Sequence, residues 1–281
     1  MDALPVLALV LLALTLTVVA PRAMSPQTSF RLCPGAALLA WQSVTVSGVC
    51  AALVSAPLAA WGIRQDHEGV WWAATALSGA MLARLLLSGH RVGTGLRTLR
   101  RRHRDQVDVL ARIDEQTGVS VLDHASPTAY CLPGRRRRIV LSRGALEALD
   151  ESETAALLAH ERAHLRARHD IILEFFTVVH HAVPRPLRCE TALAETHLLI
   201  EALADRAALR RCGARPLAGA LVAMNGSTPP GATLAGGSDQ ARVRLLLIAD
   251  AATRRPGRAA LIYSFALGVL ALPVALAVVS L

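Results

Sequence analysis

Four long apolar runs dominate the pattern of the chain. They cover residues 3–20, 36–60, 70–87 and 259–281. Each has the length and apolarity of a helix that crosses a bilayer, which takes about 20 residues. The last run contains no charged side chain, and the third contains only Arg84, close enough to one end for its head group to reach the interface. We therefore predict four transmembrane helices.

Between the third and fourth runs the pattern becomes polar and mixed. A polar helix is expected at residues 98–116, followed by three short β-like runs that share alternating or β-branched residues: 119–123, 128–132 and 137–142. Pro133-Gly134 separates the last two runs, so they are expected to pair as a hairpin.

Two longer helical runs follow the β-like segments, after a short helix at 145–149. Asp150 with Glu153 three residues later forms a capping-box pattern that opens the first, which we expect to run to the break at Pro184 and Pro186. The second is expected at 187–211, ending near Gly213. The pattern predicts a mostly α membrane protein with a small β-sheet. Its predicted parts are three spans in 1–90, an α+β cytoplasmic domain in 91–258 and the last span in 259–281.

Composition and charge support this organisation. The chain is 53% hydrophobic with a mean hydropathy of +0.41, and its 30 basic residues are all Arg, for a net charge of +9. Because no nucleic-acid motif accompanies this charge, we expect contact with the lipid bilayer and no direct nucleic-acid partner. The five cysteines are scattered and form no CxxC pair, so no disulfide framework is predicted.

The arginines also predict the orientation. Six lie at 91–104, directly after the third span, and three lie at 254–258, before the fourth. Because basic residues stay on the cytoplasmic side, region 90–258 is expected inside the cell and both termini outside, in a multi-pass protein of the bacterial plasma membrane.

The stretch "HERAH" is the strongest chemical signal. His160 and His164 lie four residues apart, so a helix places both imidazoles on one face, where they can bind one Zn²⁺. Glu161 follows the first histidine and can take a proton from a water at the metal without being a ligand.

A catalytic zinc site needs a third protein ligand. The candidates are acids or histidines further along the chain: Glu174, Glu190, Glu195, His197 and Glu201. Spacing alone does not choose among them, and His197 is also a candidate for stabilising an oxyanion. However, "EALAD" places Glu201 and Asp205 one turn apart beside small alanines, and Asp205 could accept the outer N–H of a ligating histidine. The alternative is a pair of surface acids.

"HERAH" followed by "EALAD", after a β-hairpin, resembles the BlaR/MecR family of membrane metallopeptidases and, more distantly, the HtpX and CAAX-protease group. The resemblance implies a zincin-like, gluzincin domain with His160, His164 and Glu201 as zinc ligands. It also implies Glu161 as general base, Asp205 as a supporting residue and an orienting role for Asp170. The chain stops at Leu281, so we expect no penicillin-binding sensor domain.

We therefore expect an integral membrane zinc endopeptidase that cleaves a cytoplasmic or membrane protein. The resemblance implies regulated proteolysis and signal transduction, with a winged-helix transcriptional repressor or the protein itself as substrate. The alternatives are a membrane-protein quality-control protease and a non-catalytic zinc-containing scaffold.

Overall fold

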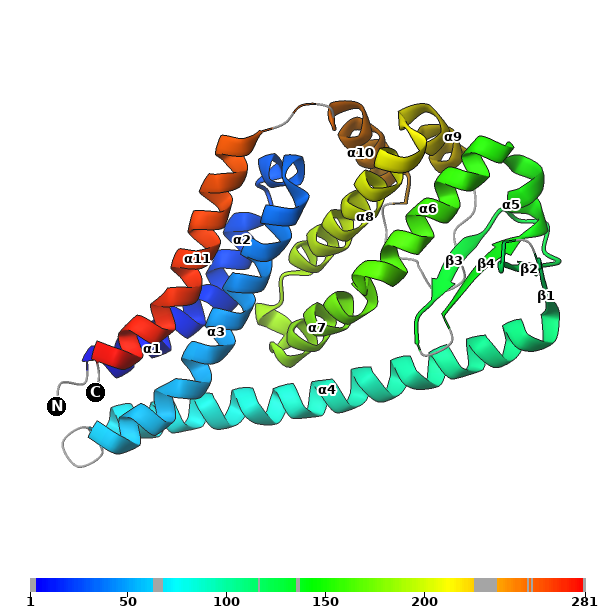
Figure 1. Cartoon of the computed structure of the whole chain (residues 1–281). Coiled ribbons are helices and arrows are strands. Elements are labelled where there is room, and N and C mark those ends of the chain that lie inside the picture. The colour runs from blue at the N-terminus through cyan, green and yellow to red at the C-terminus, as the bar shows by residue number, and fades with distance from the viewer. Residues whose placement is uncertain are drawn as a thin grey trace. The chain divides into compact units, whose positions relative to one another are not determined.

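The computed structural model is mostly helical and contains one small sheet (Figure 1). It describes residues 4–62, 68–115, 117–134, 137–224, 237–251, 253 and 255–279. The chain divides into two compact units, which are described separately. The first unit comprises Met1–Gly93, Glu174–Leu199 and Arg255–Leu281, and the second comprises Thr94–Leu173 and Ile200–Arg254.

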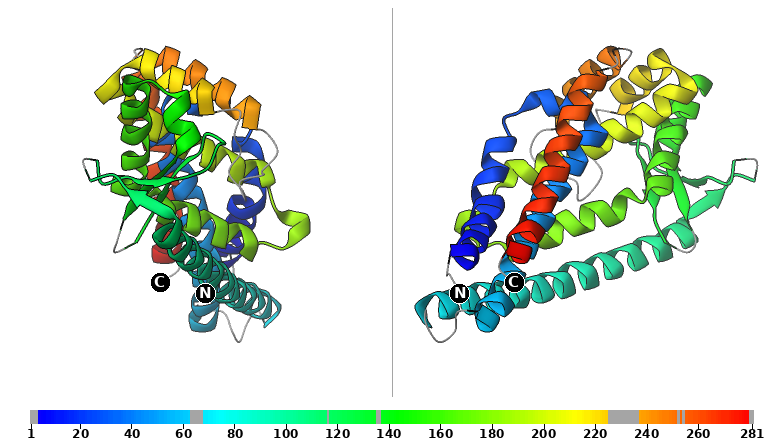
Figure 2. Two further views of the ribbon diagram at one scale, coloured as in Figure 1. Left: turned by 90° about the vertical axis from the view of Figure 1, so that its right-hand side faces the viewer. Right: turned by 60° about the vertical axis from the view of Figure 1, so that its left-hand side comes forward.

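The first unit is built from apolar helices. Its elements are α1 (Leu4–Leu14), η1 (Thr15–Val19), α2 (Ala20–Met24), η2 (Thr28–Leu32), α3 (Pro34–Gly62), α11 (Pro256–Val279), the first part of α4 (Glu68–Leu110), most of α7 (His169–Ala182), η3 (Arg185–Leu187) and the start of α8 (Glu190–Cys212). In Figure 2, α1, α3 and α11 lie side by side, and all three pairs are in contact.

Small side chains allow these helices to approach closely. Ala51 and Ala52 of α3 are fully buried against Leu9 and Ala13 of α1. Ser47 Oγ donates to the carbonyl of a residue in α11 at 2.9 Å. Buried alanines and serine hydrogen bonds are the contacts that helices use where lipid, not water, is the solvent.

Four helical stretches are long and apolar enough to cross a membrane: Leu4–Met24, Pro34–Ala60, Glu68–Leu110 and Pro256–Val279. They contain the four predicted spans, apart from the terminal positions 3, 280 and 281, which lie outside the described residues. The polar helix expected at 98–116 is confirmed as far as Leu110, where it continues the third candidate span as part of α4. Its expected end is wrong, because Ala111–Ile113 form a strand, and residue 116 lies outside the described residues. At 1.5 Å per residue, α4 is roughly 65 Å long, about twice the thickness of a hydrocarbon core.

The second unit contains a four-stranded mixed sheet. Its strands are β1 (Ala111–Ile113), β2 (Ser120–Leu122), β3 (Ala129–Leu132) and β4 (Arg138–Ser142), in the order β1-β2-β4-β3. The predicted hairpin is confirmed, because β3 and β4 pair antiparallel. The sequence did not predict β1 or the parallel pairing of β2 with β4.

Alternate residues of β4 face two different helices. Ile139 and Leu141 pack with Leu157 and Leu158 of α6 (Glu151–Ala167). Val140, from the opposite face, packs with residues of β3 and of the polar half of α4. The sheet therefore lies between α6 and the end of α4, and β3 forms one of its edges next to α6.

The helices around the sheet follow the predicted order, with one correction. α5 (Arg143–Ala148) and α6 are present, and the capping box at Asp150 and Glu153 is confirmed by reciprocal hydrogen bonds of 2.8 and 3.1 Å. The expectation of one uninterrupted helix to Pro184 is wrong. α6 ends at Ala167, Arg168 adopts a left-handed conformation with φ 52°, and α7 begins at His169.

Three helices complete the second unit. α8 ends at Cys212, and Gly213 follows it with a φ of 82°, the left-handed turn that glycine permits, near the end that the sequence predicted. α9 (Ala214–Met224) packs against α6, and α10 (Gly237–Asp250) packs against α9.

Gly144 provides a test of the packing beside β4. A Cβ at this position would lie 1.8 Å from the carbonyl oxygen of Ala125 and collide with backbone. We expect Gly144→Ala to lower the free energy of unfolding by about 3 kcal/mol or more through overpacking. The matched control is Gly95→Ala on α4, where nothing lies within 4 Å, and this change should be neutral or stabilising by up to about 1 kcal/mol. Thermal unfolding of the purified protein in detergent measures both, and equal midpoints for the two variants would contradict the expectation.

Candidate metal centre

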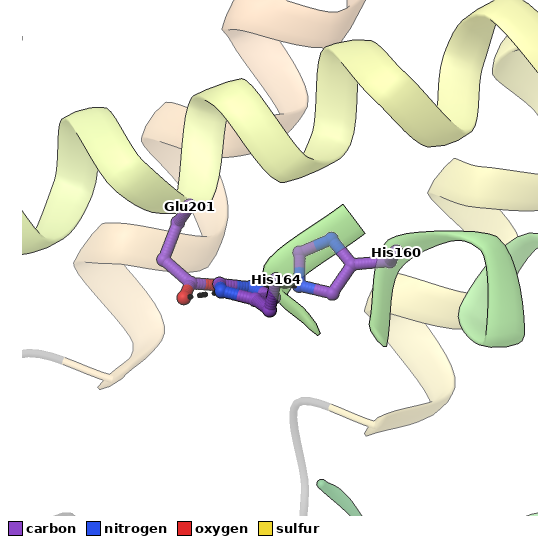
Figure 3. Close-up of side chains that lie close together, drawn as sticks. All are labelled: His160, His164 and Glu201. Carbon is purple, nitrogen blue, oxygen red and sulfur yellow. Dashed lines mark hydrogen bonds and ion pairs between the residues drawn. The ribbon is translucent and has the colours of Figure 1, made fainter. Parts of the chain in front are cut away.

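His160, His164 and Glu201 converge within the second unit from two helices (Figure 3). α6 carries both histidines on one face, and α8 carries Glu201. Ala156 and Ala159 of α6 and Ala208 of α8 belong to one buried cluster, together with Leu217 of α9 and Ile248 of α10. The structure thus brings together the three residues that the sequence proposed as ligands.

The distances between the donor atoms fit one shared cation. Nε2 of His160 lies 3.0 Å from Nε2 of His164, and each nitrogen lies 3.4 Å from a carboxylate oxygen of Glu201. Ligand bonds of 2.0–2.1 Å at tetrahedral angles separate donor atoms by about 3.3–3.4 Å. Two imidazoles and a carboxylate are also a donor set found in catalytic zinc sites. The residues therefore fit zinc in both geometry and chemistry.

The outer ring nitrogens have their own partners. Nδ1 of His160 lies 2.9 Å from Oδ1 of Asp205, a short contact that is not aligned as a linear hydrogen bond. Nδ1 of His164 lies 3.0 Å from Nδ1 of His169, which the sequence did not single out. Each contact leaves Nε2 facing the centre, the arrangement that orients ligating histidines.

Asp170 lies one residue further along, at the start of α7. Its carboxylate pairs with Arg100 of α4 at 3.9 Å, and its charge acts on His169. Asp170 can therefore influence His164 through His169. Its expected orienting role stays a prediction.

Arg244 of α10 is the main residue that the sequence interpretation missed. Its guanidinium donates two hydrogen bonds to Asp205, at 2.7 and 2.8 Å, and lies 3.0 Å from Glu201. A signal was present in the sequence, because Arg244 lies on the same helical stripe as the buried Ala241 and Ile248. A charged residue in a buried stripe needs a partner.

Charge and burial act together at the centre. Burial alone would raise the pKa values of Glu201 and Asp205, but Arg244 and His160 hold both below their usual range. Burial also lowers the pKa of His160, yet the close carboxylates of Asp205 and Glu201 outweigh it and raise the value to about 10. Burial lowers the pKa of His164 to about 4, so this imidazole is neutral and its nitrogen can bind a metal.

Glu161 is buried beside this group, and burial raises its pKa above the usual value. The thiol of Cys131 on β3 interacts with its carboxylate. With the imidazoles of His160 and His164 neutral, as metal binding requires, the ionised carboxylates of Glu161, Glu201 and Asp205 and the guanidinium of Arg244 sum to a net charge of −2. A divalent cation would neutralise it.

Two other candidate ligands from the sequence have partners in the first unit. Glu190 lies 3.1 Å from Nε2 of His180, and Glu195 forms an ion pair with Arg31. Among the described residues, the group that could hold a metal is the one that includes Glu201.

Comparison with known families supports this assignment. Residues 96–185 match the model of peptidase family M48. The match covers about a third of the chain and includes His160, Glu161 and His164, but it ends before Glu201. It supports a metallopeptidase, and the resemblance to the BlaR/MecR family stays a prediction. No curated protein and no solved structure matches the chain.

The pairing of Arg244 with Asp205 can be tested by a double-mutant cycle. Removing the guanidinium leaves two buried carboxylates without their cation, so Arg244→Gln should lower the free energy of unfolding of the metal-free protein by about 3–5 kcal/mol. Asp205→Asn combined with Arg244→Gln should cost less than the sum of the two single changes. Thermal or urea unfolding in detergent gives the three values, and strict additivity would show that the two side chains act independently.

Proposed function

We propose that the protein is an integral membrane zinc endopeptidase that cleaves peptide bonds of a cytoplasmic or membrane protein. The observation that carries the proposal is the buried Glu161 beside the His160–His164–Glu201 group. A structural zinc site has no need of an additional buried carboxylate that is not a ligand, whereas peptide hydrolysis needs a base at that position.

Each side chain then has a defined task. His160, His164 and Glu201 would hold Zn²⁺, which when bound supplies a Lewis acid that polarises the peptide carbonyl and activates water. Glu161 takes the proton from the attacking water and passes it to the nitrogen of the leaving amine. Its burial next to His160 suits a group that exchanges a proton within the site.

The edge strand β3 is suited to hold the substrate chain. Ser142 N donates to Thr128 O, and bonded pairs alternate along an antiparallel ladder. The backbone N–H groups of Ala129 and Cys131 therefore point away from β4, toward the open edge. A peptide added to this edge by strand addition would lie next to the residue that contacts Glu161.

The membrane location and the biological role belong to the same proposal. The four apolar helices and the arginines at 91–104 and 254–258 support a multi-pass protein with its peptidase domain in the cytoplasm. The resemblance to the BlaR/MecR family favours regulated proteolysis, with a winged-helix repressor or the chain itself as substrate. Quality control of membrane proteins is the rival role.

Glu161→Gln tests the catalytic role. The amide cannot accept the proton, so cleavage should fall by about 10²–10⁴-fold while bound zinc is retained. Glu151→Gln, an exposed acid at the start of the same helix, is the matched control and should retain both. His164→Ala should lose zinc and cleavage together. Zinc is measured by mass spectrometry of the metal, and cleavage by a fluorogenic peptide library.

A Glu161→Gln variant that cleaves at the normal rate would exclude the peptidase mechanism, and one whose cellular phenotype is unchanged would favour a scaffold.

Ala129→Pro tests substrate binding at the edge strand. Proline removes the outward N–H and fits the extended backbone of an edge strand, so folding and zinc content should be unchanged. Losing one hydrogen bond to the substrate should lower kcat/KM by roughly five- to tenfold. Ala129→Val, which keeps the N–H, is the control. Equal kcat/KM for the two variants would rule out strand addition at β3.

A further inference from the structure

A hollow lies within the first unit, outside the metal centre. It has a volume of about 480 Å³, within the range of small-ligand pockets. Its basic lining comes from three elements: Arg84 and Arg91 of α4, His181 of α7, and Arg185 and Arg188 around η3. We call it the arginine pocket. It is lined by four guanidinium groups and no acidic side chain.

Main-chain carbonyls hold two of these arginines in place. Arg188 donates to the carbonyls of Val183 and His181, both at 2.9 Å, and Arg84 donates from Nε to the carbonyl of Ala182. These bonds orient the guanidinium groups without neutralising them, because a carbonyl carries no net charge. Within the described part of the chain, no carboxylate forms an ion pair with Arg84, Arg185 or Arg188.

The charge of the arginines lowers the pKa of His181, which lines the pocket. Burial lowers the pKa of His181, and the charges of Arg188, His180 and Arg185 lower it further, against the opposing effect of Glu190. His181 is thereby kept neutral, and Arg84, Arg185 and Arg188 have no carboxylate counter-ion among the described residues. An arrangement of this kind attracts an anion with several oxygen acceptors.

The apolar surroundings indicate which anion. Arg84, Leu87, Ser88 and Arg91 form one stripe of α4, and Leu87 lines the pocket while exposing 48% of its surface. Leu82 and Leu86, on the same apolar half of α4, expose 49% and 65%. The pocket therefore lies where the apolar part of a candidate span meets its first cluster of arginines.

We propose that the arginine pocket binds the phosphodiester headgroup of an anionic phospholipid from the cytoplasmic leaflet. The guanidinium groups contact the phosphate oxygens, and the acyl chains follow the exposed leucines of α4. Basic pockets beside transmembrane helices on the cytoplasmic side bind such headgroups. The inference depends on the proposed membrane location and orientation, and not on the proposed peptidase activity.

The test uses the full chain in nanodiscs of phosphatidylcholine, with phosphatidylglycerol as the probe. Native mass spectrometry counts the lipids retained after release, and titration gives their affinity. The wild type should retain phosphatidylglycerol in preference to phosphatidylcholine. The triple variant Arg84→Gln, Arg91→Gln, Arg185→Gln should bind it on the order of a hundredfold more weakly. The control removes three exposed arginines of α4 outside the pocket (Arg97→Gln, Arg101→Gln, Arg102→Gln) and should bind within about threefold of the wild type.

Additional variants and competing anions test the lipid site further. If the triple Gln variant does not fold, Arg185→Gln alone serves instead and should weaken phosphatidylglycerol binding about fivefold. Replacement of the same three arginines by Lys should preserve most of the affinity, because the positive charge near the headgroup is kept. Equal loss in the control variant would overturn the proposal. So would competition by glycerol phosphate at the lipid's own affinity, which would indicate a soluble anion, or tighter binding of an oligoglutamate peptide, which would indicate an acidic protein segment.

Two independent readings separate this inference from the function proposed above. Flotation with pure phosphatidylcholine vesicles measures membrane insertion without an anionic lipid, and zinc content measures the metal centre. A protein that inserts and binds zinc but shows no preference for phosphatidylglycerol would refute the lipid site alone. A protein that fails to insert would refute the membrane location on which the site depends.

Discussion

The buried cluster shared by α6, α8, α9 and α10 is the constraint on which the candidate site depends. In it, Ala156 and Ala159 of α6 and Ala208 of α8 pack with Leu217 and Ile248, and Glu201 meets His160 and His164 beside it. This arrangement buries several carboxylates at once, which is costly unless each is paired. Arg244 supplies one positive charge from a third helix, and the remaining negative charge favours a divalent cation. The donor distances and the net charge of the site therefore both favour a divalent cation.

The parts of the site that were predictable from the sequence are pairs of residues separated by one turn of a helix. His160 and His164, and likewise Glu201 and Asp205, lie four residues apart, and this spacing fixes a shared face without knowledge of the fold. Arg244 follows Asp205 by 39 residues, and its role depends on how α10 packs. His169 reaches His164 only because Arg168 turns the chain between α6 and α7. Both were missed because tertiary packing, and not local spacing, places them.

In the sheet, too, the pairing of strands adjacent in the sequence was predictable, whereas the pairing of distant strands was not. The β3–β4 hairpin was predictable, since Pro133-Gly134 marks its turn and the strands are adjacent in sequence. The parallel pairing of β2 with β4 joins Ser120 to Val140 across the hairpin, and no local pattern encodes it. This pairing leaves β3 at the edge of the sheet, beside α6. The arrangement that suits β3 to hold a substrate is thus a product of long-range pairing.

The continuity of α4 has a mechanical consequence. Its apolar half carries Arg84 and Arg91 of the arginine pocket, and its polar half packs through Val107 against Val140 of the sheet. Because the described helix contains no proline and no break, the two halves cannot rotate independently without breaking backbone hydrogen bonds. One unbroken set of backbone hydrogen bonds therefore joins the candidate span to the residues that pack on the sheet.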